Sequence, residues 1–435
     1  MNRSICAIGL LGLAALVGGC PPSSDIVACD PLGCISEQNF ANAIISNLQA
    51  SPGVAGYVVT VGGRQPVFSG NAVLSSNTAM LPDQMTNIES LSKMLTTFAV
   101  LKSLSNHNIL LDTPIYSYLY SDWQSVAGTG IAPGPSGQSQ VTFRDLLTHR
   151  SGWPNDSNTP PGCSGNVTSY STLKAKIQSS TTPISQGTVG QYSNCNFAIF
   201  RELLPQMEQN PIINTLPDNL PGFNVRAQAS AQFYINYVNQ NVLGPGGIAG
   251  LRNCSPSTNP QLQMLWYPPP PYQPPNYPSL SAVPHDGTVD WTLTCGAGGW
   301  YMSAGDLFQV FNALATGKLL TTAQQTELYN TNSSNFPGLG WDNTVQNCPG
   351  AITRGQTYYW CKNGGETDNV NGVIIGIETF AGLFKCNAVP VIVVVNSPLP
   401  SPYSGTGQIT QLVTNAFAAS SVAGSPKSCP GGAGG

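Results

Sequence analysis

The sequence predicts an α+β fold in which helices flank one antiparallel β-sheet whose strands come from both ends of the chain. Residues 54–73 contain two β-rich runs around Gly62-Gly63, a pattern typical of a hairpin. Residues 370–376 and 390–395 are predicted to be two further strands. Because distant strands can share one sheet only if the chain between them is inserted, we expect a mostly α-helical insertion in the middle.

Helical periodicity predicts one helix near each of these strand pairs. The first begins at Ser90 and runs to residue 104, with apolar residues at helical spacing at Leu91, Met94, Leu95, Phe98 and Leu101. The second covers residues 408–419 and closes the fold. The intervening residues 110–314 are rich in helix and loop signals, apart from the proline-dense stretch 267–272, which must be extended or polyproline-like.

These elements predict one domain rather than two, because the sheet is split between distant segments. The expected parts, in chain order, are a signal peptide at 1–19, a tether and helix at 20–50, sheet-forming residues at about 51–110, a helical insertion at about 111–329, sheet-forming residues at about 330–423 and a Gly/Pro-rich tail at 424–435.

Composition excludes partners that depend on charge. Charged residues make up 8% of the 435 residues and the net charge is −4, against about 25% charged residues in an ordinary soluble protein. Lys and Arg form no cluster, so we expect no nucleic-acid partner and little attraction to anionic lipid. A hydrophobic content of 41% suffices for a large core with a substrate cleft.

The N-terminus is predicted to direct export. Arg3 precedes a short apolar run at residues 6–17, which is too short to span a bilayer, and Gly18-Gly19 supply small residues before Cys20. Residues 17–20 resemble the lipobox of bacterial lipoproteins, which would make Cys20 an acylated N-terminus anchored to the bacterial cell envelope. The alternative is ordinary signal cleavage nearby, which gives a periplasmic or secreted protein.

Of the 12 cysteines, ten follow Cys20, an even number in an exported chain. Disulfides are therefore expected, with pairs near each other in the chain as the simplest arrangement. Zinc ligation or a thiol nucleophile needs paired C-x-x-C spacings or a nearby base, and neither is present. We expect no metal and no cofactor.

Ser90-Leu91-Ser92-Lys93 has the pattern Ser-x-x-Lys, whose spacing places both side chains on one face of a helix. A serine hydroxyl becomes a strong nucleophile only when a base takes its proton. A partly desolvated lysine can do so, because burial favours its neutral form. The pattern alone is weak, since Ser171-Thr172-Leu173-Lys174 also matches it.

Two later motifs favour the Ser90 copy. Tyr192-Ser193-Asn194 follows a loop and starts a helix, whereas the other Tyr-x-Asn matches, at Tyr234 and Tyr237, lie inside a helix-like stretch. Lys362-Asn363-Gly364-Gly365 holds the only Lys-x-Gly of the chain and is expected to precede a strand. A Ser-x-x-Lys followed by a polar motif and a late Lys-x-Gly is typical of acyl-serine enzymes.

With these motifs the chain resembles the class C β-lactamase and DD-peptidase group of serine hydrolases, which also includes esterases. The resemblance runs from about residue 54 to residue 419 and includes the segments at 141–154, 298–307 and 338–341. It implies a β-lactamase/transpeptidase-like fold. It also implies hydrolysis of an ester, an amide or D-peptide, or a β-lactam bond in a small-molecule or peptide substrate.

The resemblance assigns the chemical steps to three side chains. Ser90 would attack the substrate carbonyl and become an acyl-enzyme, while Lys93 and Tyr192 would share general-base and general-acid duty. The backbone amides of Ser90 and Gly365 would form the oxyanion hole.

The same resemblance assigns substrate contacts to the second and third motifs. Asn194 would hold the catalytic lysine and a substrate amide. Lys362 would hydrogen-bond Tyr192 or attract a substrate carboxylate, and Asn363 and Gly364 would contact substrate. Glycines suit this segment because a backbone that approaches substrate closely has no room for side chains.

Two departures shift the expected substrate away from β-lactams. The third motif is Lys-Asn-Gly rather than the usual Lys-Thr-Gly, so Asn363 lacks the hydroxyl that helps to bind a drug carboxylate. Glu366 follows the glycines and would repel an anionic substrate. We therefore expect an esterase or DD-peptidase rather than a dedicated β-lactamase. The competing function is a catalytically silent cell-envelope binding protein with the same fold.

Each candidate residue also has an interpretation without catalytic meaning. Ser90 and Lys93 can mark an exposed helix start, Tyr192 a packed side chain beside an Asn194 helix cap, and Lys362 a solvated turn.

Three further residues are assigned outside the catalytic set. His149 is expected to be structural, because a Ser-His-Asp triad of this kind needs a Gly-x-Ser-x-Gly elbow, which the chain lacks. Trp266 and Tyr267 either line a substrate cleft or cover the proline-dense stretch.

Overall fold

The computed structural model describes residues 26–30, 33–51, 54–73, 77–134, 139–154, 169–185, 188, 190–218, 225–256, 264–267, 290–329, 338–342, 359–370, 373–386, 388–399 and 408–424. The predicted signal peptide, Cys20, the proline-dense stretch after Tyr267 and the C-terminal tail lie outside the described residues. None of the helices in the described ranges combines the length and apolar composition needed to cross a membrane.

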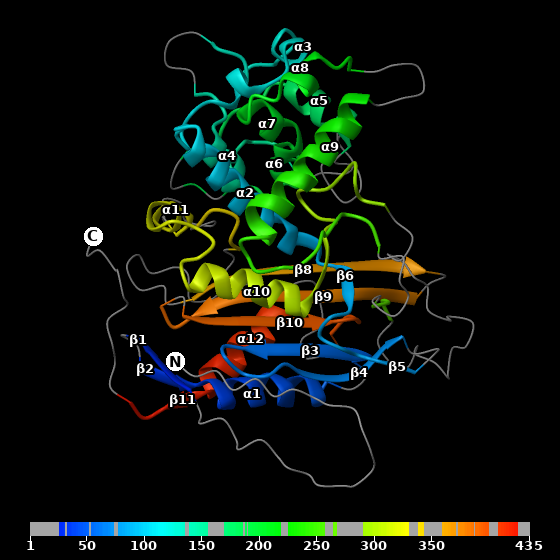
Figure 1. Ribbon diagram of the computed structural model, residues 1–435, viewed down its shortest axis with the longest axis vertical. Helices are drawn as coiled ribbons and strands as arrows, with labels where there is room; N and C mark the ends of the chain where they lie inside the picture. Colours follow the sequence, from blue (N-terminus) through cyan, green and yellow to red (C-terminus); the bar gives the residue numbers. More distant parts are fainter. Residues whose placement is uncertain are drawn as a thin grey trace.

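One antiparallel sheet joins the two ends of the chain, as the sequence predicts (Figure 1). Its strand order is β5-β4-β3-β10-β9-β8. The strands are β3 (Gly56–Val61), β4 (Val67–Val73), β5 (Thr78–Ala79), β8 (Tyr359–Val370), β9 (Val373–Phe384) and β10 (Val389–Val395). β10 pairs with β3 from Val391↔Val61 to Val395↔Tyr57, so the N-terminal hairpin and the C-terminal strands form a single split sheet.

The C-terminal strands differ from the prediction in one respect. The strand expected over residues 370–376 is wrong: β8 ends at Val370, β9 begins at Val373, and these two residues pair with each other across a hairpin. The sequence carries a signal for this reversal, since Asn-Gly, as at residues 371–372, is the dipeptide typical of a two-residue hairpin turn. Lys362 therefore lies within β8 and does not precede a strand.

Two hydrophobic cores lie on opposite faces of this sheet. Helices α1 (Glu37–Gln49) and α12 (Gln408–Ala419) cover one face, and α10 (Ala304–Ala315) covers the other, beneath the helical region (Figure 1). The bounds of α12 match the predicted closing helix. All seven residues of β10 are buried, because both faces of this central strand are covered.

The first helix after Ser90 forms the centre of the helical region. α2 (Ser92–Asn106) is buried on nearly every side, from Ser92 to Leu101, as expected for a helix enclosed by others. Around it lie η2 (Ile115–Tyr118), α3 (Ser121–Gln124), α4 (Phe143–Leu147), α5 (Tyr170–Gln178), α6 (Cys195–Ala198), α7 (Phe200–Met207), α8 (Pro211–Thr215), α9 (Val225–Val238), a π-helical turn (Asn239–Leu243) and α11 (Thr322–Leu328).

Short elements complete the fold. β6 (Met85–Asn87) pairs with β7 (Tyr301–Ser303) beside the segment that leads to Ser90. A small sheet combines β1 (Val27–Asp30), β2 (Gly33–Ser36) and β11 (Ser421–Val422). It lies near the core that α1 and α12 cover.

The expected disulfides are confirmed at two pairs of nearby cysteines. Cys29–Cys34 closes the β1–β2 hairpin, and Cys254–Cys295 links two loops beside the site described below. Cys195 is also disulfide-bonded, which agrees with the prediction that it has no thiol role.

Candidate active site

Ser90 stands on a strained turn at the entrance to α2. It lies in η1 (Glu89–Leu91), a single 3-10 turn that runs directly into the helix. Glu89 has a φ of 51°, in the left-handed region that favours glycine. The Glu89 N–H donates to Asn87 Oδ1 at 2.9 Å and so holds the turn in place. A non-glycine residue in this conformation next to the candidate serine fits the rule that strain collects at functional sites.

Lys93 is fully buried and lies one helical turn beyond Ser90. Its Nζ donates to Ser90 Oγ at 3.0 Å, to Asn194 Oδ1 at 2.8 Å and to the Ala297 carbonyl oxygen at 2.6 Å. An ammonium group has three N–H donors and no acceptor, so these three acceptors match a protonated lysine. This burial excludes the interpretation of Ser90 and Lys93 as an exposed helix start.

Ala297 is a site residue that sequence reasoning missed. Its neighbours hold its carbonyl in place: Thr96 Oγ1 donates to the Gly296 oxygen at 2.7 Å, and Arg201 Nη1 donates to the Cys295 oxygen at 3.0 Å. The Cys254–Cys295 disulfide ties the same loop. The one feature of the sequence that points to Ala297 is its position directly before the family-like segment at 298–307, and this is a weak indication.

Tyr192 contacts both Ser90 and Lys93. Its hydroxyl lies 2.6 Å from Ser90 Oγ, and Lys93 Nζ is 4.9 Å from the centroid of its ring. Asn194 occupies the N-cap position of α6, yet its side chain makes no cap hydrogen bond and instead accepts from Lys93. The structure thus brings Ser90, Lys93, Tyr192 and Asn194 into one hydrogen-bonded group and does not support the cap interpretation of Asn194.

His149 packs against the ring of Tyr192. The two rings lie 4.5 Å apart, and the Ser193 N–H donates to His149 Nδ1 at 3.1 Å. Burial, followed by the charges of Lys362 and Lys93, holds the pKa of His149 well below its usual 6.5. A neutral ring that packs against Tyr192 fits the structural role that the sequence predicts for His149.

We expect His149 to make the protein less stable in acid. Below pH 6.5 the unfolded state binds a proton at His149 that the folded state excludes, so the free energy of unfolding falls as the pH falls. The contribution is up to about 1.4 kcal/mol per pH unit until the folded-state pKa is reached. Denaturant unfolding of the wild type and His149→Gln between pH 7 and pH 5 measures it. Equal pH slopes for the two proteins would contradict the assignment.

The third motif lies on β8, the outermost strand of the described sheet. An outer strand leaves part of its backbone N–H groups without ladder partners. A Cβ on Gly364 would lie 2.6 Å from the Ile88 carbonyl oxygen and 3.0 Å from Glu89 Cβ, so the backbone of β8 packs directly against the turn that carries Ser90. Gly365 follows, opposite Glu378 of β9. Only glycine allows this approach at Gly364.

Lys362 is buried and forms an ion pair with Asp342. The other Asp342 oxygen accepts from the Asn363 N–H at 2.9 Å, and Lys362 Nζ lies 5.4 Å from the centroid of the Tyr192 ring. This burial excludes the solvated-turn interpretation of Lys362. Sequence reasoning missed Asp342, although it directly follows the family-like segment at 338–341.

The comparisons with known proteins agree with the fold. A family model described as Beta-lactamase matches residues 41–403. The chain belongs to the beta-lactamase family. A search of curated proteins returned no match to this beta-lactamase-family chain.

Solved structures with the beta-lactamase-like fold resemble the chain at low sequence identity. A beta-lactamase/D-alanine carboxypeptidase from Yersinia pestis is 15% identical, with a TM-score of 0.59 over 88% of this chain and 98% of that one. A penicillin-binding protein from Bacillus halodurans is 15% identical, with a TM-score of 0.55 over 86% and 99%. A D-amino acid amidase from Ochrobactrum anthropi SV3 is 15% identical, with a TM-score of 0.56 over 88% and 98%.

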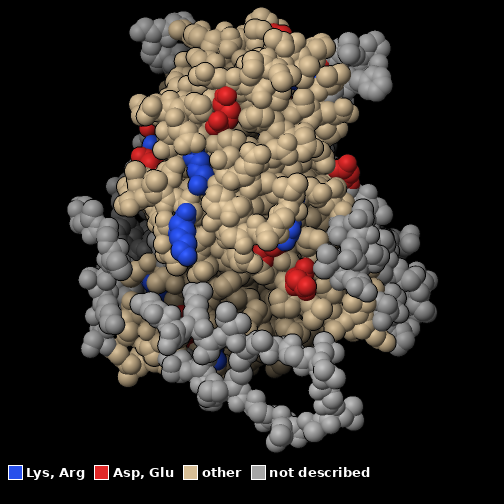
Figure 2. All heavy atoms as spheres, viewed as in Figure 1, with Lys and Arg blue, Asp and Glu red and all other residues tan. Residues whose placement is uncertain are grey.

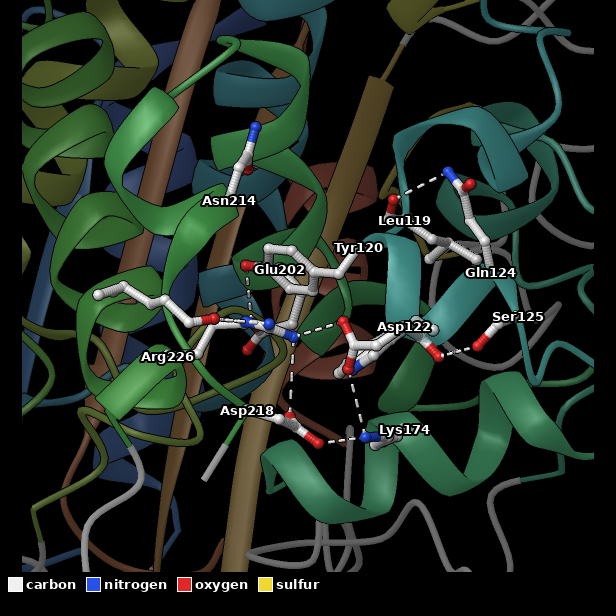
Figure 3. Close-up of polar contacts among 12 residues, drawn as sticks. Leu119, Tyr120, Asp122, Gln124, Ser125, Lys174, Glu202, Asn214, Asp218 and Arg226 are labelled. Carbon is white, nitrogen blue, oxygen red and sulfur yellow. Dashed lines mark hydrogen bonds and ion pairs between the residues drawn. The ribbon is translucent and has the colours of Figure 1, made fainter. Parts of the chain in front are cut away.

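The competing motif copies have structural partners elsewhere in this beta-lactamase-family chain. Lys174 of the second Ser-x-x-Lys lies on α5 between Asp122 and Asp218, in an ion-pair network that Arg226 extends (Figure 3). Tyr234 is buried and accepts from Trp300 Nε1 at 3.0 Å. These contacts account for both residues without catalysis.

Charged side chains are scarce on the face of the molecule shown in Figure 2, in line with the composition. Figure 2 shows isolated charged side chains on a largely uncharged face. Among the described residues, no group of three or more His, Cys, Asp or Glu side chains is arranged to hold a metal ion.

Trp266 and Tyr267 are both nearly fully buried, and Trp266 Nε1 donates to Thr86 Oγ1 at 3.2 Å. The side chain of Glu366 lies outside the described residues.

Proposed function

We propose that this protein is a serine hydrolase that forms an acyl-enzyme on Ser90 and acts on an ester or amide carbonyl. The observation that carries the proposal is the position of Ser90 Oγ, 2.6 Å from the Tyr192 hydroxyl and 3.0 Å from Lys93 Nζ. A serine placed between a possible proton acceptor and a buried cation is arranged for nucleophilic attack.

The contacts of Lys93 favour Tyr192 as the immediate base. Lys93 uses its three N–H groups on three acceptors and so donates to Ser90 Oγ, which leaves the serine O–H directed toward Tyr192. Tyr192 acts as the phenolate: as Ser90 Oγ bonds to the substrate carbon, the serine proton passes to the phenolate oxygen, Tyr192 becomes neutral, and the carbonyl electrons move onto the carbonyl oxygen. The positive charge of Lys93, 4.9 Å from the centroid of the Tyr192 ring, favours the phenolate form of Tyr192 before the proton is transferred.

Collapse of the oxyanion then breaks the bond to the leaving group, which takes the proton from Tyr192. A water molecule repeats the sequence on the acyl-enzyme: Tyr192 accepts its proton, and Ser90 recovers one when the acid product leaves. We propose the backbone N–H groups of Ser90 and Gly365 as the oxyanion hole. The close approach of Gly364 to the Ser90 turn supports this pairing.

We infer the substrate class from the third motif and from the similar solved structures. Asn363 stands where most β-lactamases of this class have a threonine, and Glu366 follows in sequence. The similar structures include a D-amino acid amidase and a D-alanine carboxypeptidase. We therefore propose ester, amide or D-peptide hydrolysis rather than dedicated β-lactam hydrolysis.

We also propose that the enzyme works outside the cytoplasm, held at the cell envelope through a lipid on Cys20. The lipobox-like sequence at residues 17–20 and the disulfides Cys29–Cys34 and Cys254–Cys295 support export. Mass spectrometry of the mature N-terminus distinguishes a lipid-modified Cys20 from ordinary signal cleavage.

Active-site labelling tests the proposed function. Purified protein is incubated with a fluorophosphonate probe or a fluorescent penicillin, and the adduct is mapped by peptide mass spectrometry. We expect labelling at Ser90 that disappears in Ser90→Ala and persists in Ser171→Ala, the matched change in the other Ser-x-x-Lys. Absence of labelling by both probes in folded protein would contradict the proposal and favour a catalytically silent binding protein.

A further inference from the structure

The lysine of the third motif does not present an isolated positive charge. Lys362 is 1% exposed, and its Nζ is paired with the Asp342 carboxylate, which is 7% exposed. Within the described part of the chain, Asp342 is the hydrogen-bond partner of this ammonium group. A buried pair of opposite charges has little net attraction for a third charge, in contrast to a lone lysine.

Asp342 is held in place by the backbone on both sides. Its N–H donates to the Cys361 oxygen at 3.1 Å, and its Oδ2 accepts from the Asn363 N–H at 2.9 Å. Two residues earlier, the Gly340 N–H donates to the Leu147 oxygen at 2.9 Å, and Gly340 packs so closely on Thr97 of α2 that a Cβ has no room. The ion pair and the Asn363 N–H together hold the carboxylate next to Lys362.

We propose that Asp342 determines specificity at this site by neutralising Lys362, so that the enzyme prefers substrates without a carboxylate at the position facing β8. The inference rests on the proposed function, whose substrate class it narrows to uncharged esters and amides. A substrate carboxylate would have to compete with Asp342 for Lys362 and would meet the negative charge of Asp342 itself. Two like charges a few ångströms apart disfavour binding even in a partly solvated cleft.

Two esters with a common acyl group measure this preference. Phenyl phenylacetate and 3-carboxyphenyl phenylacetate differ by one carboxylate on the leaving group. The measured quantity is the kcat/KM of the charged ester divided by the kcat/KM of the neutral ester. A variant that loses activity equally on both esters leaves this ratio unchanged. We expect the neutral ester to be preferred by the wild type. Asp342→Asn frees the charge of Lys362 and should raise the ratio about tenfold, a typical effect of one nearby unscreened charge.

Two further variants separate the ion pair from a general change in charge. The double variant Asp342→Asn/Lys362→Gln removes both charges and should return the ratio to within about twofold of the wild type. Asp83→Asn removes an exposed carboxylate on the loop before β6 and should leave the ratio unchanged. An Asp83→Asn ratio that rises as much as that of Asp342→Asn would overturn the inference.

If Asp342→Asn does not fold, the comparison of Lys362→Gln with the double variant isolates Asp342, because both lack the lysine. The inference then requires a ratio about tenfold lower in Lys362→Gln. Equal ratios with and without Asp342 would overturn the specificity role and leave the acyl-enzyme intact, as Ser90 labelling would show. Wild-type protein that neither hydrolyses these esters nor labels at Ser90 would instead contradict the proposed function.

Discussion

Replacing Lys93 by methionine should lower kcat/KM for an activated ester by about 10²- to 10⁴-fold, because Tyr192 loses the positive charge that makes it an effective proton acceptor. Methionine keeps much of the side-chain volume but removes the charge that lies 4.9 Å from the centroid of the Tyr192 ring. It also removes the hydrogen bonds to Ser90 and Asn194. Steady-state hydrolysis of a p-nitrophenyl ester measures the loss, and circular dichroism checks the fold.

The second Ser-x-x-Lys provides a matched control for this variant. Lys174 has the same motif position but pairs with Asp122 and Asp218 on the outer part of the helical region (Figure 3). Lys174→Met should keep kcat/KM within about threefold of the wild type, since it changes stability rather than chemistry. Retention of more than a tenth of the activity by folded Lys93→Met would show that Tyr192 does not need the charge of Lys93 to accept the serine proton.

Gly364→Val should lower kcat by about 10²- to 10³-fold, the loss that is typical when one oxyanion-hole donor is displaced. The Cβ alone would lie 2.6 Å from both the Ile88 oxygen and Thr379 Oγ1, so β8 must move away from the turn that carries Ser90. The overpacking should also destabilise the fold by about 1–3 kcal/mol. Steady-state kinetics measure the first effect, and denaturant titration the second.

Gly305→Ala is the control for this second prediction. Gly305 is the second residue of α10, where an added Cβ would meet only the Pro82 oxygen at 3.4 Å and Ser303 Oγ at 3.6 Å. Alanine in a helix is favoured over glycine, so this variant should be as active and at least as stable as the wild type. If folded Gly364→Val turns over substrate at the wild-type rate, the packing of β8 against the Ser90 turn is not required for catalysis.

Local patterns in the sequence determined most of the architecture. The hairpin around Gly62-Gly63, the helix after Ser90 and the helix at 408–419 all follow from the spacing of apolar residues over a few positions. The same kind of reasoning failed at residues 370–376, where the one predicted strand combines the last residue of β8 with the first residues of β9. Periodicity reports that a segment is extended but not where it reverses.

The sequence also identified the residues of the candidate site by type and spacing. Ser90 and Lys93 lie close together because a helix brings positions three apart onto one face. The preference for Tyr192 over Tyr234 rested on its place before a helix, and the contact of Tyr192 with Ser90 agrees with that choice.

Only the tertiary structure decided which groups surround these residues. The carbonyl of Ala297 accepts from Lys93 across 204 positions of sequence, and Asp342 pairs with Lys362 through a loop held against α2. A backbone carbonyl carries no mark in the sequence, and a single aspartate in a loop matches no period. The roles of Ala297 and Asp342 depend on chain segments that packing brings together, and local spacing in the sequence does not encode these contacts. Tertiary contacts therefore set the net charge at the third motif, and with it the proposed preference for uncharged substrates.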